Sequence, residues 1–126
     1  MELGEDPREQ LELLLLLELQ DIPAVRENSA AWGELRASAV FNPGLREPLN
    51  ASTRAWADDV AGLVGQARAA GLAAAGADPL DVAERLTALV EGVSERWLSG
   101  SATLERAREL VKGAVVAELG PRQEAP

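Results

Sequence analysis

Apolar residues recur every three or four positions along most of the chain, a spacing that places them on one face of an α-helix. Asp6-Pro7, Asn42-Pro43 and Asp78-Pro79 each put a capping side chain before a proline, a combination typical of a helix start. Pro23 opens a further segment in a similar way. The pattern predicts an all-α domain of five helices, followed by a tail over residues 121–126: 7–20, 23–41, 43–70, 79–98 and 103–119.

Two of these segments have unusual hydrophobic patterns. The first contains an unbroken run of leucines from Leu13 to Leu17, so it is apolar on nearly every side, as expected of a helix surrounded by other helices. The third is the longest and carries one continuous apolar face. Pro48 lies inside it and predicts either a kink or a helix that becomes regular only after the proline. We therefore expect an orthogonal and antiparallel bundle forming a single domain over residues 1–126.

Composition narrows the classes of function. The 126 residues include no histidine and no cysteine, which excludes disulfides, thiolate nucleophiles and any Ser-His-Asp or Cys-His site. The net charge is −9, from 21 acidic and 12 basic residues, and an acidic surface repels nucleic-acid phosphates and anionic membranes. Acidic residues precede the leucine run, which is also too short to cross a bilayer, so we expect a cytoplasmic protein without a signal peptide.

Candidate sites for metals, cofactors and catalysis are weak. Asp58-Asp59, Glu91 and Glu95 could be metal ligands, but without histidine, cysteine or EF-hand spacing they are typical of solvated helix faces. No glycine-rich motif follows a strand, so no nucleotide-binding fingerprint is present. No acid–base pair with catalytic spacing is visible. The sequence therefore predicts no metal, no cofactor and no enzymatic activity.

Trp32 and Trp56 fall on the apolar stripes of the second and third predicted helices. They either pack in the core or line an effector pocket, in which a tryptophan face can also meet a cation. Arg36 and Ser52 lie one turn from these tryptophans. Arg36 extends to solvent, pairs with an acid or binds ligand. The Ser52 hydroxyl either bonds the carbonyl one turn back or faces a cavity. The predicted ligand-binding set is Trp32, Leu35, Arg36, Ser52, Trp56, Val60, Leu89 and Val93.

The last two predicted helices carry more small and apolar residues than one small bundle needs. Gly92 and Gly113 lie in mid-helix, each costing roughly 1 kcal/mol relative to alanine, which is typical of close approach by another helix. That helix is either a neighbour in the same chain or part of a second copy. We favour a four-helix homodimer interface. Its predicted residues are Val82, Leu86, Val90, Gly92, Trp97, Leu104, Ala107, Val111, Ala114 and Val115.

Several motifs occur in a recognisable order: Asp6-Pro7-Arg8-Glu9-Gln10-Leu11, Trp32-Gly33-Glu34-Leu35-Arg36, Asn42-Pro43-Gly44, Asp78-Pro79, and Leu119-Gly120. Together they resemble the C-terminal half of TetR-family transcriptional regulators over residues 6–120. The tryptophan pattern is most similar to the branch that contains betaine-responsive repressors. The resemblance implies a homodimer paired through its last two helices and a small-molecule effector that changes the spacing of two DNA-binding heads.

The family's N-terminal helix-turn-helix head has no counterpart, since only five residues precede Asp6. We therefore expect contact with operator DNA only through a head that this chain lacks. The predicted function is effector sensing and homodimerisation in a TetR-type regulator, expected to be a repressor, with the third helix as the lever. The alternative is an effector-free dimerisation module. A cavity beside the tryptophans favours the sensor, and solid packing there favours the module.

Overall fold

The computed structural model describes residues 6–122. Within that range the chain forms five α-helices and a short 3₁₀ turn, with no strand, and these elements are α1 (Pro7–Leu16), α2 (Pro23–Phe41), η1 (Pro43–Leu45), α3 (Arg46–Ala69), α4 (Pro79–Leu98) and α5 (Leu104–Leu119). The predicted all-helical class is confirmed. The part of the predicted tail from 123 to 126 lies outside the described residues.

The helix starts follow from local capping. The Asp6 carboxylate accepts a hydrogen bond from the Glu9 amide at 2.8 Å, and the Asp78 carboxylate accepts one from the Leu80 amide at 2.8 Å. Each satisfies an amide that has no partner inside its helix, and each is followed by a proline at the first helical position. α2 starts after Ile22 without a side-chain cap.

α1 ends at Leu16, four residues before the predicted end at residue 20. The chain then tightens into a turn in which the Leu19 amide donates to the Leu16 carbonyl at 3.0 Å. Arg108 of α5 donates to the Leu19 carbonyl at 2.7 Å and so caps this turn from outside the segment. The early end therefore comes from a tertiary contact that the local pattern does not contain.

Pro48 does not interrupt a helix. The chain passes through η1 and enters α3 at Arg46, so Pro48 is the third residue of α3. An amide in the first turn of a helix has no intrahelical acceptor, so the missing amide of proline costs little there. The expected regular start only after Pro48 is wrong, and α3 runs without a break to Ala69.

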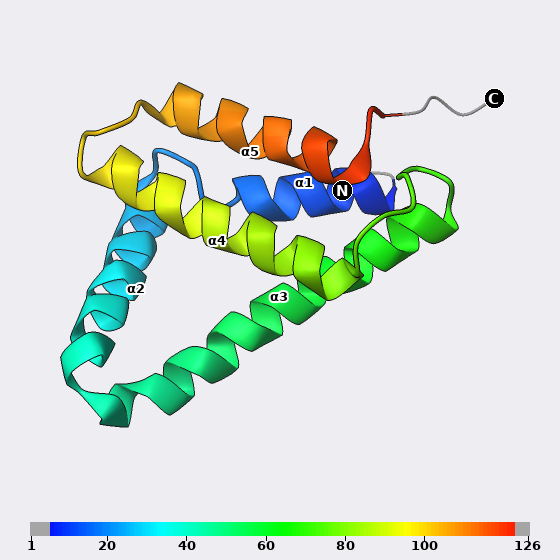
Figure 1. Ribbon diagram of the computed structural model, residues 1–126. Coiled ribbons are helices and arrows are strands. Elements are labelled where there is room, and N and C mark those ends of the chain that lie inside the picture. The colour runs from blue at the N-terminus through cyan, green and yellow to red at the C-terminus, as the bar shows by residue number, and fades with distance from the viewer. Residues whose placement is uncertain (1–5, 123–126) are drawn as a thin grey trace.

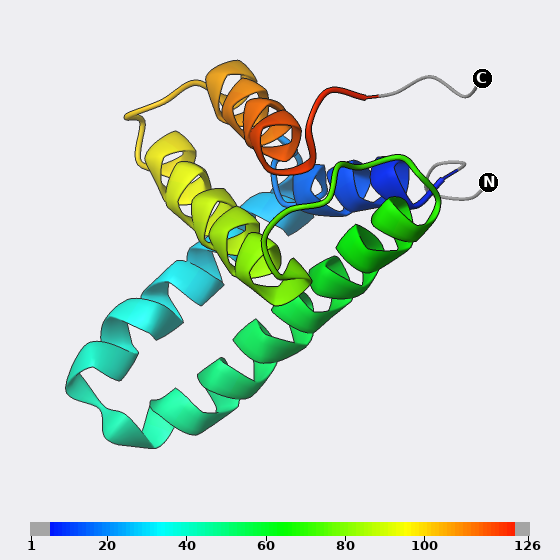
Figure 2. The same ribbon diagram turned by 45° about the vertical axis from the view of Figure 1, so that its right-hand side comes forward.

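Four helices share the core, while α2 stands apart. Figures 1 and 2 show α1, α4 and α5 packed together beside the C-terminal part of α3, with α2 and the start of α3 meeting in a projecting corner. Among the residues of α2, only Ala39 is buried, and Phe41 at its end is 90% exposed. No helix in the described range is long and apolar enough to cross a membrane. The largest fully buried side chains come from the other helices and the turn after α1: Leu11, Leu15, Leu19, Val60, Val64, Val82, Leu86, Val90, Val111, Val115 and Leu119.

Candidate functional site

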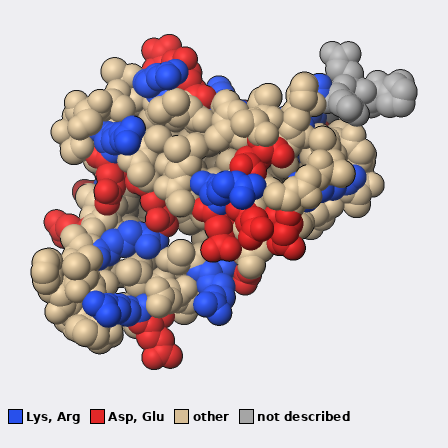
Figure 3. Space-filling view, viewed as in Figure 1, with Lys and Arg blue, Asp and Glu red and all other residues tan. Residues whose placement is uncertain are grey.

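A cavity of about 230 Å³ opens where α2, α3 and α4 meet. α2 forms one wall, the middle of α3 forms a second, and the C-terminal half of α4 forms a third. In Figure 3 the surface is hollowed between the projecting corner and the rest of the molecule. The residues that line the cavity are Glu18, Ser29, Trp32, Gly33, Arg36, Ser52, Thr53, Trp56, Val90, Glu91, Ser94 and Glu95.

Half of the predicted ligand-binding set borders this cavity, and half does not. Trp32, Arg36, Ser52 and Trp56 lie in its lining, and Trp56 also packs partly against the core. The other half lies elsewhere. Val60 and Val93 are core residues, Leu89 packs against the core, and Leu35 is half-buried on α2 outside the lining. An apolar stripe marks both core and cavity positions, so the sequence did not separate them.

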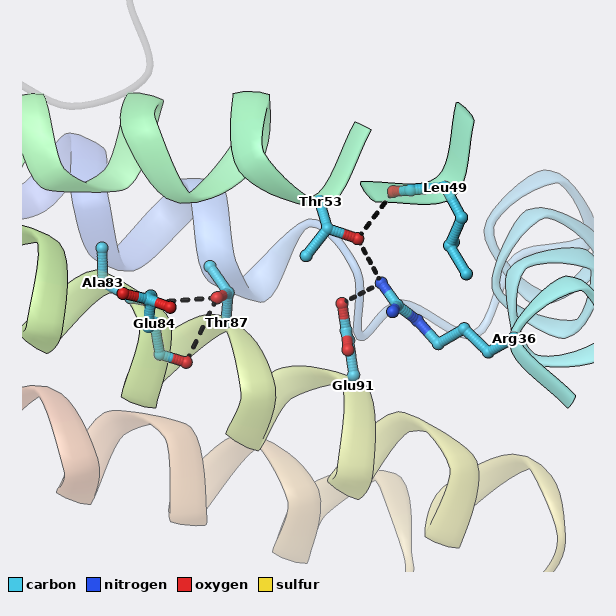
Figure 4. Close-up of polar contacts among 7 residues, drawn as sticks. All are labelled: Arg36, Leu49, Thr53, Ala83, Glu84, Thr87 and Glu91. Atoms are coloured by element: carbon cyan, nitrogen blue, oxygen red, sulfur yellow. Dashed lines mark hydrogen bonds and ion pairs between the residues drawn. The ribbon is translucent and has the colours of Figure 1, made fainter. Parts of the chain in front are cut away.

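Arg36 of α2 forms hydrogen bonds with the other two walls of the cavity, α3 and α4. Its Nη2 donates to Glu91 Oε1 at 2.5 Å and to Thr53 Oγ1 at 3.0 Å (Figure 4). The Thr53 hydroxyl in turn donates to the Leu49 carbonyl at 2.9 Å, which is the back-bond considered for Ser52. Arg36 therefore pairs with an acid, as one of its predicted roles requires, and also borders the cavity, while its predicted ligand binding stays a prediction.

Carboxylates dominate the charge of the lining. Among the described lining residues, Glu18, Glu91 and Glu95 face a single guanidinium, that of Arg36. Burial raises the pKa of Glu18. Burial also raises the pKa of Glu91, with Arg36 acting in the opposite direction and Glu95 and Glu18 adding to the increase. The cavity thus holds carboxylates that lack full compensation by a positive charge.

Two hydroxyl groups at the cavity lack partners. Ser94 of α4 is 7% exposed, and its hydroxyl makes no hydrogen bond within residues 6–122. Ser29 Oγ on α2 is buried and also lacks a partner in the described structure. Buried polar atoms are nearly always hydrogen-bonded in folded proteins, so such groups at a cavity indicate a place where water or a ligand binds.

Apart from Ser52, sequence reasoning did not assign the acids and hydroxyls of this lining to the pocket. Glu18 carried a signal, because it interrupts an otherwise apolar segment of leucines. A second signal was Gly33, a glycine inside a predicted helix. In the structure, a Cβ placed there would lie 3.2 Å from Glu95 Oε1. A glycine beside Trp32 thus lets α2 approach α4 closely. Glu91 and Glu95 were predicted to lie on solvated helix faces, with metal binding as the alternative.

A second hollow of about 480 Å³ lies between α3 and α4. Thr53 and Glu91 line both this hollow and the first cavity. Its lining is mostly exposed and includes Arg54, Asp58 and Glu84. It is therefore a surface groove and lacks the tryptophans of the first cavity.

Most of the predicted interface side chains are buried within a single protomer. They are Val82, Leu86, Val90, Trp97, Ala107, Val111 and Val115. They pack in the protomer's own core and have little surface left for a partner. Leu104 and Ala114 are half-buried, and Gly92 is exposed. A Cβ at Gly92 or Gly113 would meet no described atom within 4 Å, so neither glycine serves a helix contact inside the described protomer.

Comparison with known proteins identifies a family model and a solved structure that are similar to this chain. A family model described as the C-terminal part of a BetI-type transcriptional repressor matches residues 7–120. A crystal structure of a protein assigned to the TetR family of transcriptional regulators, from Rhodococcus sp., is 46% identical in sequence and superposes with a TM-score of 0.85. The match covers 90% of this chain and 61% of that one, so the chain spans about three fifths of its relative. None of the curated proteins matches.

The family match and the superposition agree with each other and with the sequence motifs. The match spans all five described helices, from the first residue of α1 to the residue after α5. The relative shares the fold, and at 46% sequence identity over 90% of this chain the similarity also indicates a common family. The predicted resemblance is therefore confirmed, and the chain belongs to the TetR family of transcriptional regulators, as a C-terminal domain of the BetI type.

Proposed function

We propose that this domain binds a small-molecule effector in the cavity between α2, α3 and α4, and that the effector changes the geometry of a homodimer in a transcriptional repressor. The cavity carries the proposal. It lies beside Trp32 and Trp56, combines the apolar surface of their indoles with acids and hydroxyls, and contains hydroxyls without partners. Ligand sites have these properties, and a volume of about 230 Å³ suits a ligand smaller than a typical drug.

The weak attachment of α2 gives the effector a means of action. α2 buries little apolar surface, and its side chains hold α4 through the Arg36–Glu91 ion pair and through Arg26, whose guanidinium lies 5.2 Å from the centre of the Trp97 ring. An effector that touches α2 and α4 together favours one arrangement of the two helices. A difference in affinity for two arrangements is sufficient for allosteric control.

The outer face of α4 and α5 is the proposed dimer surface. Gly92 and Gly113 are exposed there, Ala114 is half-buried, and Arg85 pairs with Glu118 at 2.6 Å across the two helices. Small residues let the helices of two protomers approach closely in a four-helix arrangement. Sedimentation equilibrium should show a dimer at micromolar concentration, and a monomer there would contradict this part of the proposal.

A thermal-shift screen with a metabolite library tests effector binding. A compound at about 100 times its Kd stabilises the folded state by about 2.7 kcal/mol, so a true effector raises the Tm clearly. Ser52→Phe fills the cavity from α3 and should abolish the shift. Ser38→Phe is the matched control, because Ser38 is exposed on α2 and lies outside the lining.

The screen also separates the sensor from the alternative module. If no compound raises the Tm, or if Ser52→Phe responds like the parent chain, the cavity is not an effector site. A dimer without an effector would then be the better description of this domain.

A further inference from the structure

We propose that the effector is a compact organic cation whose nitrogen carries hydrogen atoms, that is, a primary or secondary ammonium. The inference rests on the proposed function and names the chemical class that the same cavity takes. Three features of the lining carry it: an excess of carboxylates, hydroxyls without partners, and tryptophan faces.

The charge of the lining opposes an anionic ligand. Three carboxylates face one guanidinium, and the Nη2 of that guanidinium is already engaged by Glu91 and Thr53. An anionic ligand could reach only the remaining N–H groups of Arg36 and would lie beside three carboxylates, which repel it. A cation meets Glu18 and Glu95 without breaking any contact in the described structure. Electrostatics therefore select a positive charge.

Hydrogen bonding selects the type of cation. When ionised, the carboxylates of Glu18 and Glu95 accept hydrogen bonds and cannot donate them, and the hydroxyls of Ser29 and Ser94 can also accept. A primary ammonium offers three N–H donors and no acceptor, so it complements an acceptor-rich wall. A quaternary ammonium has the same charge but no donor, and it would leave the hydroxyls of Ser29 and Ser94 without a hydrogen-bond donor.

The tryptophans accommodate the rest of the ligand. Trp32 is 37% exposed and Trp56 is half-buried, so indole surface on two different helices remains available at the cavity. Indole faces attract cations and also bury an apolar body. The volume of about 230 Å³ lies below the range of drug-sized sites, roughly 300–1,000 Å³. The ligand is therefore compact.

Titration of the site provides a further signature. The charged groups that face the ligand are Glu18, Glu91, Glu95 and Arg36. Burial raises the pKa of Glu18 and of Glu91, so acidification protonates these two carboxylates at a higher pH than usual. A bound cation favours their ionised forms and lowers both pKa values. Affinity should therefore increase as pH rises through the raised pKa values and then level off.

Calorimetry with three matched probes tests the inference on the full chain. The probes are 2-phenylethylammonium, its N,N,N-trimethyl analogue and 3-phenylpropanoate, which share an aromatic body and differ in charge and N–H donors. We expect the primary ammonium to bind about tenfold more tightly than the quaternary one, because one charge-assisted hydrogen bond contributes that much. The anion should show no saturable binding.

Variants place the binding at the cavity. Glu18→Gln and Glu95→Gln should each weaken the primary ammonium about tenfold. Ser94→Ala should weaken the primary ammonium and leave the quaternary one unchanged. Glu84→Gln is the matched control, because Glu84 is an exposed acid on the same helix outside the cavity, and it should bind the primary ammonium as the parent chain does.

The outcomes separate this inference from the proposed function. Equal or tighter binding of the quaternary ammonium or of the anion overturns the inference, and so does a Glu84→Gln loss as large as that of Glu18→Gln. If the anion binds and Ser52→Phe abolishes its binding, the cavity is still an effector site, but for another class. Absence of binding by all three probes also overturns the inference, and the library screen then decides the function independently.

Discussion

Burial and the neighbouring charges at the cavity have opposing effects on the pKa of Glu91. Burial raises the pKa of its carboxyl group, the neighbouring Glu95 and Glu18 add to the increase, and Arg36 at 2.5 Å opposes it. A raised pKa in the folded state means that the ionised carboxylate destabilises the fold above that pKa, and that acidification relieves the cost. Arg36 therefore limits a penalty that Glu91 carries at neutral pH.

Arg36→Met should expose this penalty. The free energy of unfolding should fall by about 1 kcal/mol at neutral pH, because Glu91 stays charged beside two other acids without its partner. The loss should shrink as pH falls through the raised pKa of Glu91, which lies above 4.5, since the protonated carboxyl no longer needs the guanidinium. Urea denaturation at neutral and mildly acidic pH measures both values.

The double variant Arg36→Met with Glu91→Gln is the control for this interpretation. It removes the carboxylate together with its partner, so the pH-dependent part of the loss should disappear. An equal loss at both pH values in Arg36→Met would show that Arg36 stabilises the fold by packing alone, and that its ion pair contributes little.

At the level of residues, the sequence predicted cavity positions wherever a polar or aromatic side chain lay on an apolar stripe. Trp32, Arg36 and Trp56 were found in this way. Glu18 and Glu95 were not assigned to the pocket, because a charged residue on a helix is normally solvated. Only tertiary packing brings Glu18, from the turn after α1, and Glu95, from α4, to the same cavity. Their role depends on tertiary structure, which a single helical pattern does not contain.

Helix ends are capped by arginines from other elements. Carbonyl groups at a helix C-terminus lack intrahelical donors, and a guanidinium with five N–H groups supplies them. Arg8 is 2% exposed and extends this arrangement to the loop after α3. The contacts are Arg108 with Leu19 after α1, Arg46 with Ala39 near the end of α2, and Arg8 with Gly120 after α5 and with Leu72.

Capping of helix ends by distant arginines explains which helix boundaries the sequence predicted. Starts at Pro7, Pro23 and Pro79 were predicted correctly, because a proline at the first helical position marks each of them locally, with a capping aspartate before Pro7 and Pro79. The end of α1 was placed four residues too late, because Arg108 lies far away in sequence. Local chemistry defines where these helices begin, and tertiary contacts decide where α1 ends.

Arg8→Met should be the most damaging of these substitutions. Arg8 donates to the Leu72 carbonyl at 2.9 Å and to the Gly120 carbonyl at 2.6 Å, and it joins α1 to both segments. Methionine leaves two carbonyls without donors, so we expect the free energy of unfolding to fall by about 3 kcal/mol. Arg8→Lys should recover only part of it, because an ammonium cannot reproduce the fork of a guanidinium.

Urea denaturation checks these values against an exposed arginine. Arg106 lies on α5 and makes only a loose ion pair with Glu109 at 3.9 Å. Arg106→Met should change stability by less than about 0.5 kcal/mol. If Arg8→Met had an equally small effect, water would be replacing the guanidinium at both carbonyls, and Arg8 would not hold the segments together.

At the scale of the molecule, much of the apolar surface of the last two helices is covered within the protomer itself. Val82, Val111 and Val115 were predicted at a dimer interface, but they pack in the core of their own protomer. An amphipathic stripe shows that a face is covered and does not show which chain covers it. The glycines are different, since Gly92 and Gly113 have no described neighbour within the protomer to explain them.

Gly92→Ala and Gly113→Ala should therefore have opposite effects on folding and on assembly. Each alanine stabilises its helix by roughly 1 kcal/mol, and no described atom lies within 4 Å of the added Cβ in the protomer. In a dimer joined through these faces, the same methyl group enters the interface and weakens association.

Gly62→Ala is the matched control, because Gly62 is equally exposed and open in α3, away from the proposed surface, and it should stabilise the protomer without changing the dimer. Sedimentation equilibrium measures association, and urea denaturation of the dilute protein measures folding, since dimerisation adds to apparent stability at high concentration. Weakened association in all three variants would point to a general effect of alanine, and unchanged association in Gly92→Ala and Gly113→Ala would exclude close helix contact at these glycines.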